Sequence, residues 1–143
     1  MQTVFIRHNL NSKPETLKHL WDERLVAIHF ENFRSTNPDD YGSSGKRALK
    51  RLWKYCDSGA IVGASFRTIK PNQMLVGEIE KGSKVELLEL GKLSDKDDIY
   101  KVVKLKNVQE VSYLDYPLLA AIQPRLGTLT GWPSAENYLL AIL

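Results

Sequence analysis

The chain of 143 residues is poor in the side chains that form disulfides and metal sites. It has one cysteine, Cys56, and three histidines. A single cysteine cannot form a disulfide within the chain, and His8, His19 and His29 are not spaced like the clustered ligands of a structural zinc site. We therefore expect a reducing, cytoplasmic environment, no bound metal and no cofactor.

Long apolar runs and a strong charge of one sign are also lacking. No run approaches the roughly 20 apolar residues that cross a bilayer, and the first residues lack the apolar core of a signal peptide. The 20 basic and 17 acidic residues give a net charge of +3. We predict a soluble protein with no membrane partner, which would bind a polyanion only where its basic residues cluster.

The motifs of common enzyme classes are missing as well. The chain has no Gly-x-Ser-x-Gly elbow, no Walker-type phosphate loop and no dinucleotide fingerprint. The pair Pro38-Asp39 matches the first half of a restriction-nuclease motif, but Lys81 stands at the wrong spacing from the acidic residues before it. Cys56 lies on the apolar side of a predicted helix, where a buried thiol is expected rather than a nucleophile. We predict that the chain is not an enzyme.

The composition, with 43% hydrophobic and 26% charged residues, is that of one packed domain over residues 1–143. The patterns predict strands at 3–6, 25–30, 60–69, 74–80, 85–90 and 100–108, and helices at 14–24, 44–58, 115–122 and 133–143. The last four strands are expected to pair in chain order as an antiparallel meander. This order predicts an α+β fold, a small, partly closed antiparallel β-barrel flanked by helices. Because the chain ends inside an apolar helix, we expect either the N-terminal part of a longer protein or a helix that packs back on the domain.

The helix predicted at 44–58 carries a basic side and an apolar side. The apolar side consists of Leu49, Leu52, Trp53 and Cys56. The basic side consists of Lys46, Arg47, Lys50, Arg51 and Lys54. Positive charge along one side of a helix suits contacts with successive phosphates, so we predict that these five residues bind a nucleic-acid backbone. A solvated helix face is the other interpretation.

Aromatic residues with polar neighbours stand close to this helix in the sequence. They are Trp21, His29, Phe30, Phe33, Tyr41, Phe66 and Trp132. A pocket for a planar base needs aromatic faces for stacking and a few polar groups for the base edge. Each ring alone is more commonly a core residue, and we expect Trp53 in the core. Tyr41 lies on a turn-rich loop where burial is least expected, so it is the favoured candidate for a partly exposed ring.

Several short motifs occur in an order that is similar to a known family. A first strand is followed by a helix with Leu20-Trp21, the strand 26–30, a tyrosine-bearing loop and the basic helix, and then the segments 59–62 and 74–79. This order resembles the EVE branch of the PUA-like superfamily, which includes N-terminal readers of modification-dependent restriction systems. The resemblance covers roughly residues 3–111, and the segment 113–143 has no counterpart in it.

The resemblance implies a small barrel that holds an extruded, often methylated base in an aromatic pocket beside a basic surface. The pocket residues that we expect are Asn9, Trp21, His29, Phe30, Tyr41, Ser65, Phe66 and Arg67. The expected function is a DNA-binding module that reads a modified base by base flipping and serves a nuclease or motor, on a following domain or a partner. An RNA-binding PUA-like domain and a protein-interaction module are the alternatives.

Overall fold

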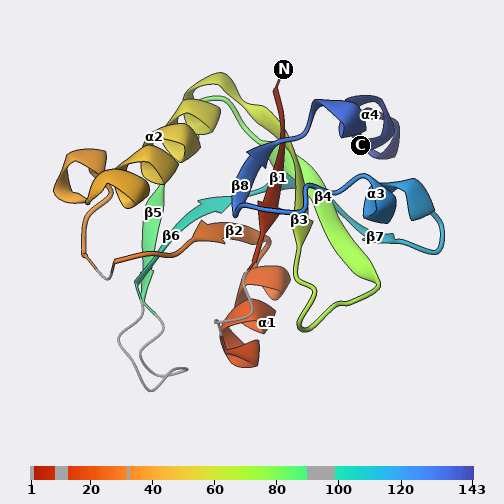
Figure 1. Ribbon diagram of the computed structural model, residues 1–143, viewed down its shortest axis with the longest axis horizontal. Coiled ribbons are helices and arrows are strands. Elements are labelled where there is room, and N and C mark those ends of the chain that lie inside the picture. The colour runs from red at the N-terminus through yellow and green to blue at the C-terminus, as the bar shows by residue number, and fades with distance from the viewer. Residues whose placement is uncertain (1, 9–12, 32, 90–98) are drawn as a thin grey trace.

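The computed structural model describes residues 2–8, 13–31, 33–89 and 99–143, and it shows a mixed α+β fold (Figure 1). The strands are β1 (Gln2–Arg7), β2 (Leu25–Ile28), β3 (Ala60–Ser65), β4 (Gln73–Ile79), β5 (Glu86–Glu89), β6 (Ile99–Lys104), β7 (Lys106–Ser112) and β8 (Leu129–Gly131). The α-helices are α1 (Pro14–Asp22), α2 (Ser43–Ser58), α3 (Pro117–Ala121) and α4 (Glu136–Ile142), and η1 (Pro38–Asp40) and η2 (Pro133–Ala135) are short 3₁₀ helices. The α+β prediction is confirmed, and β8 is a strand that the sequence patterns did not predict.

The strands form two sheets, and one pair in them is parallel. The larger sheet has the order β7-β4-β3-β1-β8 and the smaller one the order β2-β6-β5. In the parallel pair, Gln2 of β1 lies opposite Ala60 of β3 and Arg7 lies opposite Ser65. The prediction of a wholly antiparallel barrel is therefore wrong at this pair. The chain between β1 and β3 contains α1, β2, η1 and α2. This long crossover lets β3 run in the same direction as β1.

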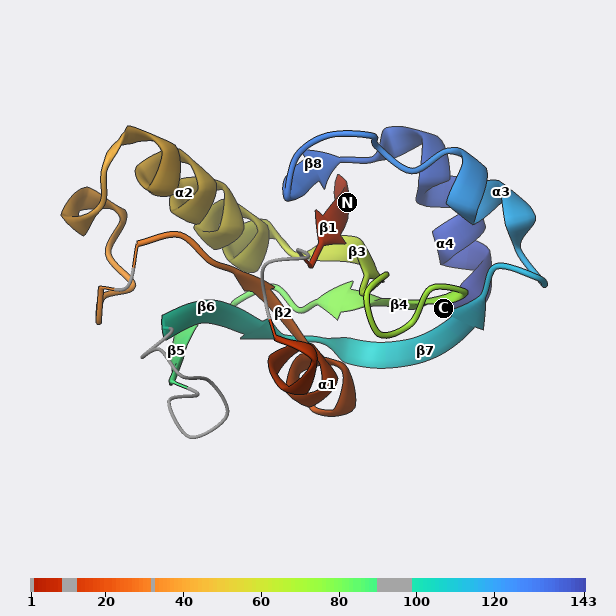
Figure 2. The same cartoon turned by 60° about the horizontal axis from the view of Figure 1, so that its bottom comes forward.

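The last strands pair in chain order only in part. The pairs β3-β4 and β5-β6 are antiparallel, as the predicted meander requires, but β4 pairs with β7 instead of β5, so the meander is wrong at this step. β6 continues into β7 through Leu105, and Figure 2 shows the two as one long bent ribbon that links both sheets. The amide of Leu105 donates to the carbonyl of Arg24 at 2.9 Å. Over the part of the chain that the structure describes, the strands make two linked sheets and no closed barrel is found.

The main core lies between the two sheets, and α1 and α2 cover its sides. α1 contributes Leu17, Leu20 and Trp21, and α2 contributes Leu49, Leu52, Tyr55 and Cys56. The predicted apolar side of α2 is confirmed at three of its four positions, because Trp53 is only half-buried. Burial raises the pKa of the Cys56 thiol to about 11, so this thiol is an apolar packing group.

A second core covers the opposite face of the larger sheet, and the C-terminal segment supplies it. Side chains of one strand alternate between the two faces, so Phe5 faces this second core while Val4 faces the main one. The ring of Trp132 meets Phe5 edge-on at 5.2 Å, and its Nε1 donates to the carbonyl of Ile122 at 2.9 Å. Leu119 and Leu139 of α3 and α4 complete the layer on the right of Figure 2. The segment 113–143, which had no assigned role, thus seals one face of the sheet.

Candidate functional site

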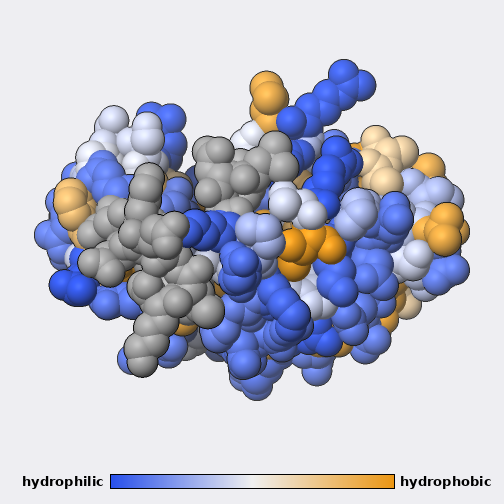
Figure 3. Space-filling view, turned by 90° about the horizontal axis from the view of Figure 1, so that it is seen from below, coloured by the Kyte–Doolittle hydropathy of each residue, from blue (hydrophilic) through white to orange (hydrophobic). Residues whose placement is uncertain are grey.

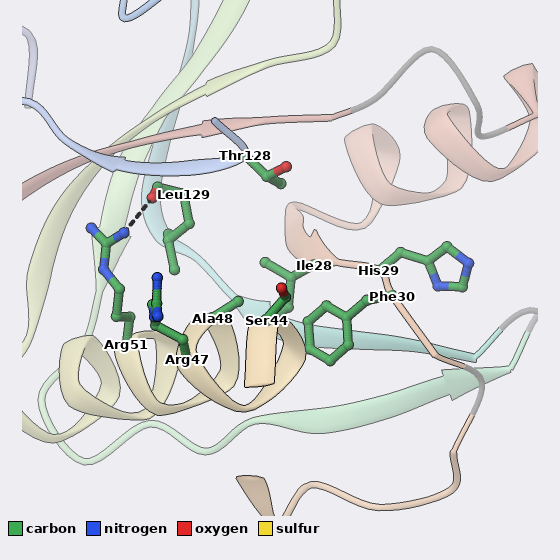
Figure 4. Close-up of a pocket in the computed structure, with 9 residues that line it drawn as sticks. All are labelled: Ile28, His29, Phe30, Ser44, Arg47, Ala48, Arg51, Thr128 and Leu129. Carbon is green, nitrogen blue, oxygen red and sulfur yellow. Dashed lines mark hydrogen bonds between the residues drawn. The ribbon is translucent and has the colours of Figure 1, made fainter. Parts of the chain in front are cut away.

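A cavity of about 260 Å³ lies between the end of β2, the first half of α2 and the segment that leads into β8 (Figure 4). Its lining residues are Ile28, His29, Phe30, Ser44, Arg47, Ala48, Arg51, Thr128 and Leu129. We refer to it as the α2 pocket. The structure therefore brings together two groups that were predicted separately, the aromatic end of β2 and the basic side of α2.

Phe30 forms an aromatic wall of the α2 pocket and is held from several sides. Its ring meets Tyr41 edge-on, with the ring centres 5.2 Å apart and an interplanar angle of 87°. The backbone of Gly45 packs so closely that a Cβ there would lie 2.6 Å from the Phe30 ring. The ammonium of Lys101 lies 4.6 Å from the ring centre. Phe30 is only half-buried, so a firmly held ring still borders the cavity.

Lys101 is a buried cation behind this wall, and sequence reasoning missed it. Its side chain is fully buried, and its Nζ donates to the carbonyls of Glu31 at 2.5 Å and Ile99 at 3.2 Å. The rings of Phe30 and Tyr41 both lie within 5 Å of the ammonium. Burial lowers the pKa of Lys101 to about 8, and the Glu31 carboxylate opposes that shift. The signal available in the sequence was a lysine between the apolar residues Tyr100 and Val102 of β6.

The two arginines of the pocket have different surroundings. Arg51 is half-buried, and it donates to the carbonyl of Leu129 at 2.8 Å and to the Tyr55 hydroxyl at 3.4 Å. These bonds occupy two of its five N–H donors and fix β8 against α2 (Figure 4). Arg47 is exposed, and its guanidinium rises from α2 beside Arg51 (Figure 4). Arg47 is thus the more available cation for an anionic ligand.

The remaining polar groups of the pocket lie at its rim. Ser44 and Thr128 bring hydroxyls from α2 and from the segment before β8. His29 stacks on Tyr100 with the ring centres 4.4 Å apart, and in Figure 4 its ring points away from Arg47. A planar ligand beside Phe30 would therefore meet hydroxyl groups on either side.

Three of the predicted pocket aromatics are core residues. Trp21, Tyr41 and Phe66 are 3%, 5% and 0% exposed, so none of them offers a free ring face. Phe66 stacks on His8 at 3.9 Å and meets Trp21 edge-on at 5.4 Å. The expected exposure of Tyr41 is wrong. Its hydroxyl lies 2.9 Å and 2.6 Å from the carbonyls of Phe33 and Ser35, and it is the hydrogen-bond donor for these two carbonyls on the inner side of the loop.

Ser65 and Arg67 line a different cavity, of about 410 Å³, at the end of β3. We refer to it as the β3-end pocket. Its lining residues are Arg7, His8, Ser65, Arg67, Ala120, Ala121, Gln123, Pro124 and Arg125. Asn9, which was also expected in the base pocket, lies outside the described residues. The predicted base-pocket residues are therefore divided between two cavities and the core.

A small cavity shares lining residues with both pockets, and we refer to the three cavities together as the groove. The small cavity shares His29 and Thr128 with the α2 pocket, and Arg7 and His8 with the β3-end pocket. None of the described residues that line these three cavities is acidic. The ends of β1 and β3 point to the bottom of Figure 1, and the face seen from there is largely hydrophilic (Figure 3). As far as the described residues show, the groove therefore offers arginines without competing carboxylates.

The three lysines of the basic side lie farther from the α2 pocket. Lys46 is 3.6 Å from the carboxylate of Asp39. Lys50 and Lys54 line an open cavity on the outer side of α2 together with Trp53, whose Nε1 donates to the carbonyl of Thr36 at 2.8 Å. The expectation that Trp53 is a core residue holds only in part, because Trp53 packs against the main core but is only half-buried.

In comparisons with known proteins, no family model matches the chain, and no significant match is found to a curated protein or to a solved structure. Among the described residues, no group of three or more His, Cys, Asp or Glu side chains is placed to hold a metal ion. None of the helices in these residues is long and apolar enough to cross a membrane. The geometry of the groove is therefore the basis for the functional proposal.

Proposed function

We propose that the protein is a nucleic-acid-binding module, with DNA as its partner, that accepts an extruded base in the α2 pocket. The observation that carries this proposal is that Phe30 and Arg47 line one cavity, and that no described residue lining this cavity or its two neighbours is acidic. An aromatic wall and a nearby cation match the two parts of a nucleotide, the planar base and the phosphate.

The size and polarity of the α2 pocket support a single base as the ligand. Its volume of about 260 Å³ lies just below the range of about 300–1,000 Å³ that is typical of small-molecule sites. Phe30 provides the stacking surface, and the hydroxyls of Ser44 and Thr128 provide hydrogen bonds to the base edge. Arg47 and the exposed lysines of α2 bind the flanking phosphates, which gives affinity for any sequence.

Three finer features belong to the same proposal, and the motif order of the chain supports them. The fold is related to PUA-like domains, the preferred base is methylated, and the module acts for a nuclease or motor domain rather than as an enzyme. Base flipping explains how a methyl group can be recognised, because an extruded base exposes its edges to the pocket and can be enclosed on several sides.

A binding screen tests the proposal directly. Matched DNA and RNA oligonucleotides, each with and without one methylated base, are titrated at a single salt concentration, and a fluorescent base analogue at the target position reports unstacking. We expect duplex DNA with the modified base to bind best and to show increased fluorescence. A preference for RNA would assign the groove to 2′-hydroxyl recognition, and no binding to any oligonucleotide would refute the proposal.

A further inference from the structure

The β3-end pocket differs from the α2 pocket in the kind of ligand that it suits. Its three arginines come from three places in the chain: Arg7 from β1, Arg67 from the turn after β3, and Arg125 from the segment between α3 and β8. Among the described residues that line it, His8 alone has an aromatic ring, and that ring is covered by Phe66 at 3.9 Å. The pocket therefore offers hydrogen-bond donors and positive charge but no stacking surface for a base.

Arg7 holds the wall of the pocket in place, because its guanidinium is engaged by other residues of the protein. Its guanidinium donates to the carbonyl of Gly127 at 2.8 Å and to the carbonyl of Pro124, and it lies over the ring of Phe5 at 5.1 Å. These contacts fix the segment 124–127 beside the ends of β1 and β3. Arg125 belongs to this fixed segment, so its position at the pocket is set by Arg7.

Arg67 and Arg125 are the cations that remain for a ligand. Both are exposed, and neither forms an ion pair with any described residue. The Tyr113 phenol interacts with Arg67, and burial raises the pKa of this phenol, so it stays neutral near pH 7. Two guanidiniums without carboxylate partners, at one cavity, are a strong arrangement for an oxyanion.

His8 is neutral, so the arginines are the charged groups among the described residues that line this pocket. The Nε2 of His8 accepts a hydrogen bond from the amide of Ala27 at 3.1 Å, so Nδ1 carries the proton and donates to the carbonyl of Ser65 at 3.0 Å. Burial lowers the pKa of His8 to about 4. Both ring nitrogens are thus occupied, and His8 contributes a neutral wall to the pocket.

We infer that the β3-end pocket is a phosphate-binding subsite, in which Arg67 and Arg125 hold a phosphate group against the ends of β1 and β3. The small cavity shares Thr128 with the α2 pocket and Arg7 with this pocket, so the two pockets are near neighbours at the ends of β1 and β3. The phosphate is then a backbone phosphodiester of the strand whose base enters the α2 pocket, and in this form the inference rests on the proposed function.

The test follows the arginine side chains directly. In ¹⁵N-labelled protein, the Nε–H signals of Arg67 and Arg125 are monitored during titration with inorganic phosphate and, separately, with the DNA that binds best. We expect both signals to shift with each ligand, while Arg34, which is paired with Glu89 at 2.7 Å, stays unchanged. Oligonucleotides with one neutral methylphosphonate linkage then locate the phosphate along the strand.

Variants separate this subsite from the base pocket. We expect the double variant Arg67→Ala/Arg125→Ala to lower the salt-dependence slope of DNA binding by about 1, as the loss of one phosphate contact predicts, and to keep the preference for the modified base. Arg34→Ala is the matched control and should change neither quantity. A one-dimensional proton spectrum of each variant shows that it is folded.

The outcomes distinguish the two proposals. If DNA binds the wild-type protein but leaves both arginine signals and the slope of the double variant unchanged, the phosphate subsite is refuted and the proposed function stands. If inorganic phosphate shifts both signals while no oligonucleotide binds, the subsite is supported with free phosphate as its ligand and the proposed function is refuted. With DNA that carries the methylphosphonate linkage at the contacted position, the wild-type protein and the double variant should have the same salt-dependence slope. This result would confirm a backbone phosphodiester as the ligand.

Discussion

Gly45 controls the position of the aromatic wall, and its replacement by alanine separates stacking from all other contributions to binding. A Cβ on Gly45 would lie 2.6 Å and 2.7 Å from two carbons of the Phe30 ring. Carbon atoms in ordinary contact are about 3.5–4.0 Å apart. Because the Gly45 backbone belongs to α2, the half-buried ring has to move instead, by about 1 Å. The substitution therefore changes the α2 pocket without removing any functional group.

Two opposing contributions keep the expected stability change small. Alanine stabilises a helix interior by about 1 kcal/mol relative to glycine, and overpacking costs about 1–3 kcal/mol, so we expect Gly45→Ala to lower the free energy of unfolding by about 0–2 kcal/mol. Stacking of a base on an aromatic ring contributes about 1–3 kcal/mol. At 1.4 kcal/mol per factor of ten, its loss lowers affinity for the modified site by about 5- to 150-fold.

The assay is a titration of modified and unmodified duplexes at one salt concentration. Gly45→Ala and Phe30→Ala should both reduce the preference for the modified duplex and retain binding that weakens with salt. Gly131→Ala is the matched control, because no atom lies within 4 Å of the position of its Cβ. If both pocket variants keep the wild-type preference while the ring signals of Phe30 shift in Gly45→Ala, Phe30 is not a stacking wall and the assignment of the α2 pocket is wrong.

Three further measurements test other parts of the structure. Gly63→Ala should lower the free energy of unfolding in urea by about 1–3 kcal/mol, because its Cβ would lie 2.6 Å from the buried ring of Trp132; an unchanged urea midpoint would contradict the packing of the second core. Neutral His8, with its pKa lowered from 6.5 to about 4, contributes stability that is complete above pH 6.5 and is lost as the pH falls toward 4, by about 3 kcal/mol. His8→Gln should remove this part of the pH dependence, and equal slopes in both proteins would show that the histidine is not buried. Arg47→Ala should lower the salt-dependence slope of DNA binding by about 0.9, whereas Lys18→Ala, which removes an exposed ion pair with Asp22 on α1, should leave it unchanged.

The positions of most strands and helices could be predicted from the sequence, but their pairing could be predicted only for the neighbouring strands β3-β4 and β5-β6. Local patterns are sufficient for α2, where the predicted range 44–58 differs from Ser43–Ser58 by one residue. They do not show that β4 pairs with β7, because pairing depends on contacts between distant segments. β8 has three residues, too few for an alternating pattern, and its pairing with β1 forms only in the complete fold.

The sequence predicted some residues of the candidate site correctly, but it did not predict which aromatic side chains are buried. Phe30 and Arg47 lie in one cavity because β2 ends beside the first half of α2. The sequence suggested an exposed ring at Tyr41, since its loop is polar and turn-rich. Instead, the carbonyls of Phe33 and Ser35 in this loop point inward, and the buried Tyr41 hydroxyl donates hydrogen bonds to them. Whether an aromatic residue on a loop is exposed thus depends on backbone hydrogen bonds that residue types do not reveal.

The central place of β1 in the larger sheet has a consequence for the order of events during synthesis. β1 lies between β3 and β8, so its two neighbours are made after about 60 and about 130 residues of the chain. Contacts that span so much sequence form slowly, because a long loop has to close before they stabilise anything. Until β8 arrives, the emerging chain presents an open edge of an apolar strand, the kind of surface that chaperones protect and that aggregates in their absence. Production of this protein should therefore depend on slow translation or on chaperone supply.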